Sequence, residues 1–463
     1  MKKLESFKRL IQLSLSGIGL AAQVVIFAHF YFKYYFEWIR EIYVYYEKGH
    51  ALMIAVYAFL LFMFSNTYGG TRIGYQRNVE LIFSQIMGTF VTNVLAGAVI
   101  ALMCRGRIST QELLLMSLIQ LIVAGIWTLI ASQIYKLVFP PRHLLLIHGD
   151  RPIQAIIHKL ESRKDKYIVD STININEGED AVCDEALNGY DAVVIWDIPA
   201  KERNNILKFC YGKGVRVYIM PKISDVILAG AEMLHVFDTP ILLTREYSLK
   251  FEQRAIKRAA DFILSLLLII ITSPIMIITA IAVKLYDFGP VIYKQVRCTR
   301  GGKKFKILKF RSMRVDAEKD GVARLAKKKD DRITPIGRFI RKCRIDELPQ
   351  LFNILAGDMS FIGPRPERPE IIAQYVKEMP EFAFRTKVKA GLAGYAQVYG
   401  KYNTTPYDKL KLDLCYIENY SVWLDLKLML LTIKVLFWPD STEGVGEGQI
   451  TAMSESEAEE KND

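Results

Sequence analysis

Four long apolar segments dominate the first third of the chain. They lie at residues 11–32, 51–68, 79–103 and 112–135. Each is about long enough to cross a bilayer as a helix. The N-terminus and the loop around Arg72 and Arg77 are basic, which favours a cytoplasmic N-terminus, although Arg105 and Arg107 would then face outward. We therefore predict a four-helix transmembrane bundle over residues 1–140.

A second pattern begins after Pro140 and Pro141, where short apolar runs alternate with helical stretches. The apolar runs lie at residues 143–149, 166–173, 191–197 and 215–221. Such alternation is typical of a parallel α/β sheet. The turn after the first run, HGDRPIQ, has one glycine where a dinucleotide-binding fingerprint needs three. We predict a Rossmann-like α/β domain over residues 141–247, and we favour a structural, oligomeric or regulatory role for it over NAD binding.

The apolar segment at residues 262–283 could by its length be a fifth span. Basic residues are dense on both flanks, and only one flank of a crossing helix can lie on the cytoplasmic side. Pro274 removes a backbone hydrogen bond and bends the helix, and Ser273 can partly satisfy the freed groups. We therefore predict a re-entrant membrane helix with its kink at Ser273 and Pro274. The alternative is an ordinary span with a kink.

The stretch at residues 341–370 carries the candidate chemistry. Asp346 and Glu347 are adjacent carboxylates at the expected start of a short amphipathic helix that Gly357 ends. Arginines crowd both sides of this pair, at positions 338, 341, 344, 365 and 368. Guanidinium groups hold phosphates, while one carboxylate can attack phosphorus and the other can hold a divalent metal. On spacing alone, Asp346 fits the role of an ordinary helix N-cap equally well.

The net charge of +12 is unevenly distributed, since residues 284–345 hold 20 Lys and Arg against 6 Asp and Glu. Beside a membrane segment, such a block favours lipid and substrate phosphates over nucleic acid. Two strands are expected to meet at Gly301–Gly302, with Lys309 and Arg311 on one face, where they could reach a phosphate. The six cysteines are scattered, which argues against a disulfide framework and against a zinc site.

Residues 248 to 438 resemble the bacterial sugar transferase family, the polyprenyl-phosphate hexose-1-phosphate transferases, in its large form with an N-terminal membrane bundle. The family's motifs appear in order: KR at 257–258, SP at 273–274, GPV at 289–291, KFRSM at 309–313, DDRITPIGRFIR at 330–341, IDELPQ at 345–350, GDMS at 357–360 and GPRP at 363–366. The segment VKAGLAGYAQV at 388–398 is similar to the family's VKPGITGLAQV but departs from it at Ala390 and Ala393.

This resemblance implies a monotopic α/β catalytic domain over residues 248–439. Its expected reaction moves hexose-1-phosphate from a UDP-sugar to undecaprenyl phosphate and releases UMP, at the start of exopolysaccharide, capsule or O-antigen synthesis. The resemblance implies that Asp346 attacks phosphorus to form an aspartyl-phosphosugar and that Glu347 binds Mg²⁺. The expected phosphate ligands are Lys309, Arg311, Arg341 and Arg365. The expected location is the bacterial inner membrane, with the catalytic domain facing the cytoplasm.

Two other functions fit parts of the pattern. Four spans followed by an α/β domain also occur in membrane-anchored nucleotide-sugar dehydratases and epimerases, although the missing glycine-rich turn counts against tightly bound NAD. The other is a non-enzymatic scaffold for polysaccharide machinery. The pattern leaves open which sugar is transferred, with glucose and galactose the usual choices, as well as the homo-oligomeric state and the ligand of the middle domain. Residues 440–463 are acidic, and we expect a disordered tail there.

Overall fold

The computed structural model describes residues 5–42, 47–105, 109–244, 249–314, 332–400 and 404–436. The chain forms two compact units, residues 1–221 and residues 222–463. The first unit contains both the apolar helices and the parallel sheet. The second contains the segment with the candidate chemistry. The predicted acidic tail lies outside the described residues.

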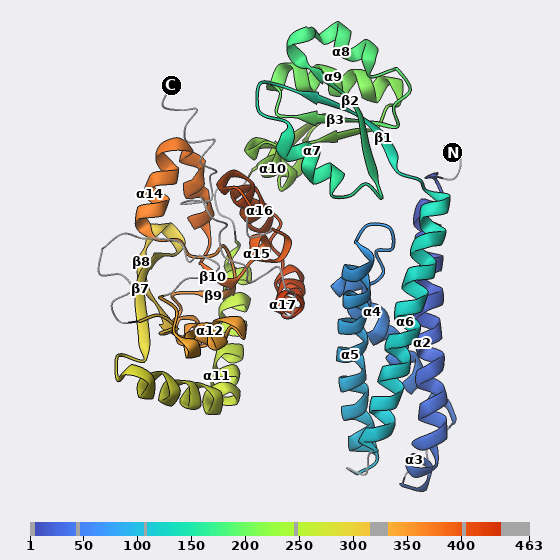
Figure 1. Ribbon diagram of the computed structural model, residues 1–463, viewed down its shortest axis with the longest axis vertical. Helices are drawn as coiled ribbons and strands as arrows, with labels where there is room; N and C mark the ends of the chain where they lie inside the picture. Colours follow the sequence, from blue (N-terminus) through green and yellow to red (C-terminus); the bar gives the residue numbers. More distant parts are fainter. Residues whose placement is uncertain are drawn as a thin grey trace. The chain divides into compact units, whose positions relative to one another are not determined.

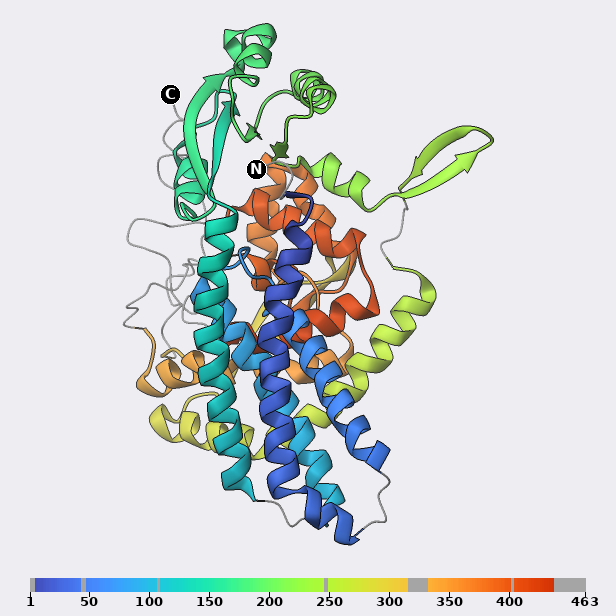
Figure 2. The ribbon, with the colours of Figure 1, turned by 90° about the vertical axis from the view of Figure 1, so that its right-hand side faces the viewer.

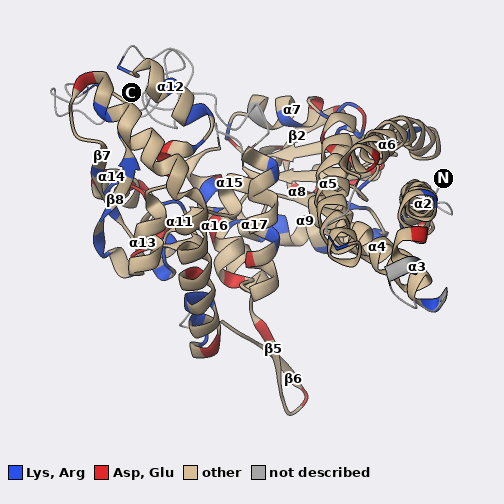
Figure 3. Cartoon of the chain, turned by 90° about the horizontal axis from the view of Figure 1, so that it is seen from below, with Lys and Arg blue, Asp and Glu red and all other residues tan. Residues whose placement is uncertain are grey.

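The four predicted apolar segments form four long helices of the first unit (Figure 1). They are α2 (Lys8–Tyr34), α4 (Glu47–Tyr68), α5 (Asn78–Met103) and α6 (Thr110–Val138), with the short α3 (Phe36–Ile42) after α2. All four are long and apolar enough to cross a membrane. Figure 3, which looks along these helices, shows them mostly without Lys, Arg, Asp or Glu. Large apolar side chains such as Phe90 and Leu114 are exposed on them, which in water would be unfavourable. The chain is therefore a membrane protein.

Neutral polar side chains occupy the interior of this bundle. The Tyr57 hydroxyl donates to Asn93 Oδ1 at 2.7 Å, and Asn93 Nδ2 donates to Gln120 Oε1 at 2.8 Å. Gln120 Nε2 then donates to the main-chain oxygen of Gln23 at 2.9 Å, and Thr89 Oγ1 donates to the Gln23 side chain at 2.6 Å. These bonds join α2, α4, α5 and α6. In lipid, such contacts and close packing hold helices together, because hydrocarbon solvates apolar side chains as well as the bundle does.

The predicted parallel sheet follows α6 in the same unit. Its strands are β1 (Arg142–His148), β2 (Tyr167–Asn174), β3 (Ala192–Trp196) and β4 (Val217–Ile219), in the order β2-β1-β3-β4. Between them lie α7 (Gln154–Glu161), η1 (Ile175–Glu177), α8 (Glu179–Glu185) and α9 (Ala200–Lys213). The one glycine of the first turn, Gly149, has a local role. A Cβ there would lie 2.8 Å from the carbonyl oxygen of Asp197, so glycine is needed for two loops to approach each other.

The second unit begins earlier in the chain than the predicted boundary at residue 247. The helix α10 (Ile223–Ala229) contributes Val226 to the core of the catalytic unit. A hairpin of β5 (Glu232–Val236) and β6 (Thr239–Leu243) follows, and every residue of its strands is exposed. Figure 2 shows the hairpin extending away from α10. Because short helices dock through a few apolar side chains, the change from an α/β pattern to this docking helix left no strong signal in the sequence.

The apolar segment around Pro274 belongs to one long helix, α11 (Phe251–Asp287), the fifth helix that is long and apolar enough to cross a membrane. Figures 1 and 2 show α11 as two arms that meet at a sharp bend. Pro274 cannot donate to the carbonyl of Ile270, and the hydroxyl of Ser273 donates to that oxygen instead, at 2.8 Å. The serine thus partly replaces the bond that the proline removes, as predicted.

The rest of the second unit packs small elements around the arm of α11 that begins at Phe251. The strands are β7 (Ile292–Cys298), β8 (Lys304–Phe310), β9 (Ser360–Ile362) and β10 (Gly391–Ala393). The helices are η2 (Arg300–Gly302), α12 (Pro335–Lys342), η3 (Ile345–Glu347), α13 (Gln350–Ala356), α14 (Pro369–Glu378), η4 (Pro380–Lys387), α15 (Tyr395–Tyr399), α16 (Pro406–Glu418) and α17 (Val422–Leu436). β7 and β8 pair antiparallel across the predicted glycine turn.

Three side chains join α11 to the catalytic core. Arg258 donates to the carbonyls of Ile354 and Leu355 at 2.8 Å, and so caps the C-terminus of α13. Asp261 accepts from the backbone N–H of Phe361 at 3.0 Å, in β9. Lys257 forms a 2.6 Å ion pair with Asp425 of α17. These contacts fix the position of the catalytic core on the first arm of the apolar helix.

Candidate active site

Asp346 and Glu347 lie in the single 3₁₀ turn η3, not at the start of the α-helix as the sequence suggested. Arg344 precedes this turn in the left-handed conformation, with φ 56°, and α13 begins only at Gln350, after Pro349. Asp346 therefore caps no α-helix, and the N-cap interpretation is wrong. Gly357 ends α13 with φ 93°, as predicted.

Glu347 is held by cationic side chains from two other elements. Its Oε1 accepts from Lys309 Nζ at 2.9 Å and from Arg365 Nη2 at 3.1 Å, and Arg344 lies 3.9 Å from Oε2. Burial alone would raise the pKa of Glu347, but the charges of Lys309, Arg365 and Arg344 outweigh it and lower this pKa well below the usual range. Glu347 is therefore ionised at every physiological pH.

Asp346 has the opposite electrostatic character. Its side chain is buried. Burial is the main cause that raises the pKa of Asp346, and the negative charge of Glu347 adds to it, against the opposing charges of Lys309, Arg341 and Arg344. Two adjacent carboxylates thus have pKa values that are displaced in opposite directions. Such a division is typical of catalytic pairs in which one carboxylate reacts and the other stays charged.

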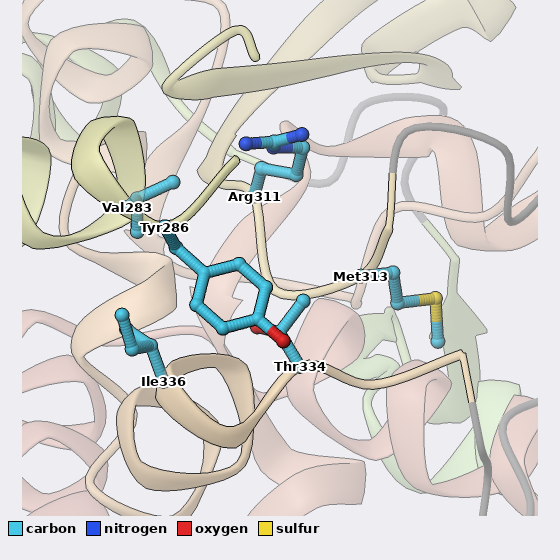
Figure 4. Close-up of a pocket in the computed structure, with 6 residues that line it drawn as sticks. All are labelled: Val283, Tyr286, Arg311, Met313, Thr334 and Ile336. Carbon is cyan, nitrogen blue, oxygen red and sulfur yellow. The ribbon is translucent and has the colours of Figure 1, made fainter. Parts of the chain in front are cut away.

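The predicted phosphate ligands do not all reach this pair. Lys309 and Arg365 contact Glu347, and Arg341 acts on Asp346 through its charge from the last turn of α12. Arg311 lies elsewhere, because β8 ends at Phe310 and the alternation of faces ends with it. Its guanidinium forms two hydrogen bonds to Asp287, the last residue of α11. It lines a pocket with Val283, Tyr286, Met313, Thr334 and Ile336 (Figure 4).

Comparison with known proteins agrees with this arrangement. Residues 252–439 match the family model described as bacterial sugar transferase. Over 190 residues, the chain is 39% identical to a UDP-glucose:undecaprenyl-phosphate glucose-1-phosphate transferase of Caulobacter vibrioides, across 40% of this chain and 71% of the relative. The chain belongs to the bacterial sugar transferase family. The β7–β8 strands, the dyad Asp346–Glu347 and the loop with Arg365 all lie inside the matched region.

Longer relatives match the same family region. A UDP-N-acetylgalactosamine-undecaprenyl-phosphate N-acetylgalactosaminephosphotransferase of Aeromonas hydrophila is 38% identical over 256 residues, 53% of this chain and 59% of that protein. A UDP-glucose:undecaprenyl-phosphate glucose-1-phosphate transferase of Escherichia coli is 39% identical over 209 residues, 44% of this chain and 43% of that protein. The match thus spans about half the length of these two sugar transferases.

The structure also reveals charged residues that the sequence did not single out. Arg385, Asp413, Glu367, Lys409 and Arg297 form a mostly buried network behind the loop that carries Arg365. They come from β7, η4, α16 and the segment between β9 and α14. No local pattern could have grouped them, because up to 116 positions separate Arg297 from Asp413. Only helical spacing in α16 hinted that Asp413 faces inward, because it lies three positions after Leu410 and four before Ile417, which are both buried.

The sequence predicts Mg²⁺ at the dyad, where the structure offers two carboxylates. Among the residues that the structure describes, no group of three or more His, Cys, Asp or Glu could hold a metal ion. Magnesium is often bound by one or two carboxylates, with water and substrate phosphates completing its shell. Oε1 of Glu347 is taken by Lys309 and Arg365, so Oε2 and the Asp346 carboxylate are the oxygens that this site could offer. All six cysteines are free in the structure.

Proposed function

We propose that this protein transfers a sugar-1-phosphate from a UDP-sugar to undecaprenyl phosphate and releases UMP. The names of the relatives from Aeromonas hydrophila, Escherichia coli and Caulobacter vibrioides support this reaction class. The observation that carries the proposal is the contrast between two adjacent carboxylates. Asp346 is buried, whereas Glu347 is charged and is held in place by Lys309 and Arg365. This arrangement suits attack on an anionic phosphorus centre.

In the proposed mechanism, an oxygen of ionised Asp346 attacks the β-phosphorus of the donor. A phosphorus–oxygen bond forms, the bond to the UMP oxygen breaks, and UMP leaves as its anion. An oxygen of the lipid phosphate then attacks the aspartyl-phosphosugar, which releases the Asp346 carboxylate and yields the lipid diphosphate sugar. Because Asp346 is poorly hydrated, little water has to be removed before its oxygen reaches phosphorus.

The cations around the dyad would stabilise charge on the donor. Lys309 and Arg365 are close enough to Glu347 to exchange part of that contact for phosphate oxygens, and Arg341 approaches the same place from α12. Mg²⁺, when bound, would offset charge on the diphosphate and polarise its oxygens. We give Arg311 no role in this mechanism, because its guanidinium pairs with Asp287.

We also propose a membrane arrangement that serves both substrates. The bend of α11, with Ser273 supporting the carbonyl freed by Pro274, fits a helix that enters and leaves the bilayer on one face. Because Arg258 and Asp261 fix the first arm to the catalytic core, the dyad would stay at the cytoplasmic surface of the inner membrane. There a lipid phosphate and a soluble nucleotide sugar can both reach it. The Rossmann-like assignment of the middle domain remains a prediction.

The test is release of UMP by the full chain in lipid nanodiscs with undecaprenyl phosphate and Mg²⁺. The donors would be UDP-glucose, UDP-galactose and UDP-N-acetylgalactosamine, the sugars in the names of the relatives. Release with one donor, dependent on lipid and absent in Asp346→Asn, supports the proposal. A covalent adduct on Asp346, detected by mass spectrometry after donor is added without lipid, supports the two-step mechanism. Inactivity of folded protein toward all donors counts against the proposal.

A further inference from the structure

In the loop Gly363–Glu367, every main-chain carbonyl from Pro364 to Glu367 accepts a hydrogen bond. The carbonyl of Pro364 accepts from the N–H of Gly391 at 2.9 Å, and that of Glu367 accepts from the N–H of Cys298 at 3.1 Å. The two carbonyls between them, those of Arg365 and Pro366, each accept a hydrogen bond from an arginine side chain. Pro364 and Pro366 fix φ on both sides of Arg365. The backbone of Arg365 therefore has little freedom, and its side chain reaches Glu347 from a fixed base.

Arg385 is the side chain that holds the carbonyl of Arg365 itself. Its Nη2 donates to that oxygen at 3.2 Å, while Arg297 Nη1 donates to the next carbonyl, that of Pro366, at 3.1 Å. Only 3% of the Arg385 side chain is exposed. It lies under the loop, on the side away from solvent. Within the described part of the chain its hydrogen bonds go to Asp413 and to the Arg365 carbonyl, not to Asp346 or Glu347. Among the described residues, the hydrogen bonds that link it to the dyad run through the loop.

The orientation of Arg385 is itself strongly constrained. Its Nε and Nη2 both donate to Asp413 Oδ2, at 3.0 and 2.7 Å, and Asp413 is 1% exposed. The ring of Phe382 lies 4.8 Å from the guanidinium carbon, and Glu367 lies 3.6 Å from Nη1. A buried ion pair of this kind adds little net stability, because the cost of removing two charges from water cancels much of their attraction. This pair therefore matters for the orientation that it gives Arg385 rather than for the stability that it adds.

We propose that Arg385, oriented by Asp413, is a positioning residue that sets the place of Arg365 against Glu347. The chain of contacts runs from Asp413 to the Arg385 guanidinium, to the Arg365 carbonyl, and through the Arg365 side chain to Glu347. This inference rests on the proposed function, since Arg365 matters only if the dyad handles phosphate. It adds to that function a buried support that links α16 to the active site.

The decisive variant replaces the ion pair by apolar side chains of similar volume, Arg385→Met with Asp413→Leu. Such replacements of buried ion pairs are often neutral or stabilising, so the protein should fold and its unfolding temperature should stay close to that of the parent. The carbonyl of Arg365 loses its donor. A displacement of about 1 Å in a group that positions substrate can cost about 10²-fold in rate, so we expect kcat/KM for the donor to fall by about that factor. Arg385→Lys, which keeps the charge, is a second variant if the double one does not fold.

A double-mutant cycle separates positioning from general structure. In an Arg365→Ala background, adding Arg385→Met/Asp413→Leu should change kcat/KM by less than about twofold, because its effect passes through Arg365. An equal loss in both backgrounds would show that the buried pair acts independently of Arg365, and parental activity in the apolar variant would show that it does not act at all. Either result overturns the proposal.

A readout independent of activity keeps this test separate from the proposed reaction. Hydrogen exchange of the amides of Gly391 and Cys298, which donate to the loop carbonyls of Pro364 and Glu367, should be faster in the apolar variant. Exchange in α13, which carries neither substitution, should be unchanged. If the parent protein releases no UMP from any donor, the proposed reaction fails while the exchange experiment still reports on the loop. Unchanged exchange at these two amides contradicts the positioning role whatever the activity.

Discussion

The buried polar groups of the two units are paired by different kinds of side chain. In the first unit, the polar interior of the bundle is neutral: Tyr57, Asn93 and Gln120 join the helices by hydrogen bonds between uncharged groups. In the second unit, the polar interior is ionic, and Glu347, Glu367 and Asp413 each pair with arginine or lysine. Both units also contain clusters of buried apolar residues, so hydrophobic burial alone does not distinguish them.

The difference follows from what surrounds each unit and from what each unit does. A charge within a bilayer is costly, and a neutral network can still satisfy buried polar groups there. Under the proposed function the second unit must bind phosphates, and fixed charges are effective against them because a preorganised charge needs no rearrangement during the reaction. We therefore expect the neutral hydrogen bonds of the first unit to determine helix packing. We expect the ion pairs of the second unit to determine the positions of the reacting groups. The following predictions test this division.

The largest effect is expected at Asp346. Asp346→Asn keeps the size of the side chain and removes the nucleophile, so UMP release should fall by at least about 10³-fold. Because burial and Glu347 disfavour the ionised aspartate, the neutral asparagine should not lower stability at neutral pH. UMP release and thermal unfolding of parent and variant check both points. Near-parental activity would exclude the covalent mechanism.

A smaller but still large effect is expected at Glu347. Glu347→Gln leaves Lys309 and Arg365 without their shared carboxylate, and removes the ionised oxygen that could hold Mg²⁺. We expect a loss of about 10²-fold in kcat and a higher Mg²⁺ concentration at half-maximal rate. A Mg²⁺ titration of the UMP release rate measures this. An unchanged half-maximal concentration would remove Glu347 from the metal site while leaving its ionic role intact.

The ionic interior should also make stability depend on pH. Burial would raise the pKa of Glu367, but Lys409, Arg385 and Arg297 lower it to about 2. A depressed carboxylate pKa stabilises the folded state above the unfolded value, 4.5, and this stability is lost as pH falls from 4.5 toward about 2. Glu367→Gln should be less stable at pH 7 and show a flatter decline over that range. The exposed Glu378→Gln on α14 is the control, and an identical decline in all three proteins contradicts the prediction.

The smallest effect is expected in the neutral interior. Asn93→Leu removes the partner of Tyr57 and of Gln120, and hydrogen bonds inside membrane bundles are worth about 0.6 to 1.7 kcal/mol. We expect destabilisation of that order in detergent unfolding and unchanged UMP release. The neighbouring, lipid-exposed Val94→Leu is the matched control. Loss of activity in Asn93→Leu at unchanged stability would mean that the bundle contributes to the reaction and not only to packing.

The sequence by itself determined the elements whose causes are local. Apolar length predicted the four bundle helices, alternation predicted the parallel sheet, and the glycine turn predicted the β7–β8 pair. Gly357 ends α13 and Pro274 lies where α11 needs Ser273, because backbone conformation and hydrogen bonding depend on residues a few positions apart. The motifs around Asp346 and Glu347 also identified the family. These features need no knowledge of distant contacts.

Tertiary structure alone decided the rest. Lys309 and Arg311 separate, since β8 ends between them and Asp287 comes within reach of the second. The opposite pKa displacements of two neighbouring carboxylates, and the support of Arg365 by Arg385, depend on burial and on charges contributed by remote elements. Such properties arise only when the chain brings those elements together, so no local pattern can record them.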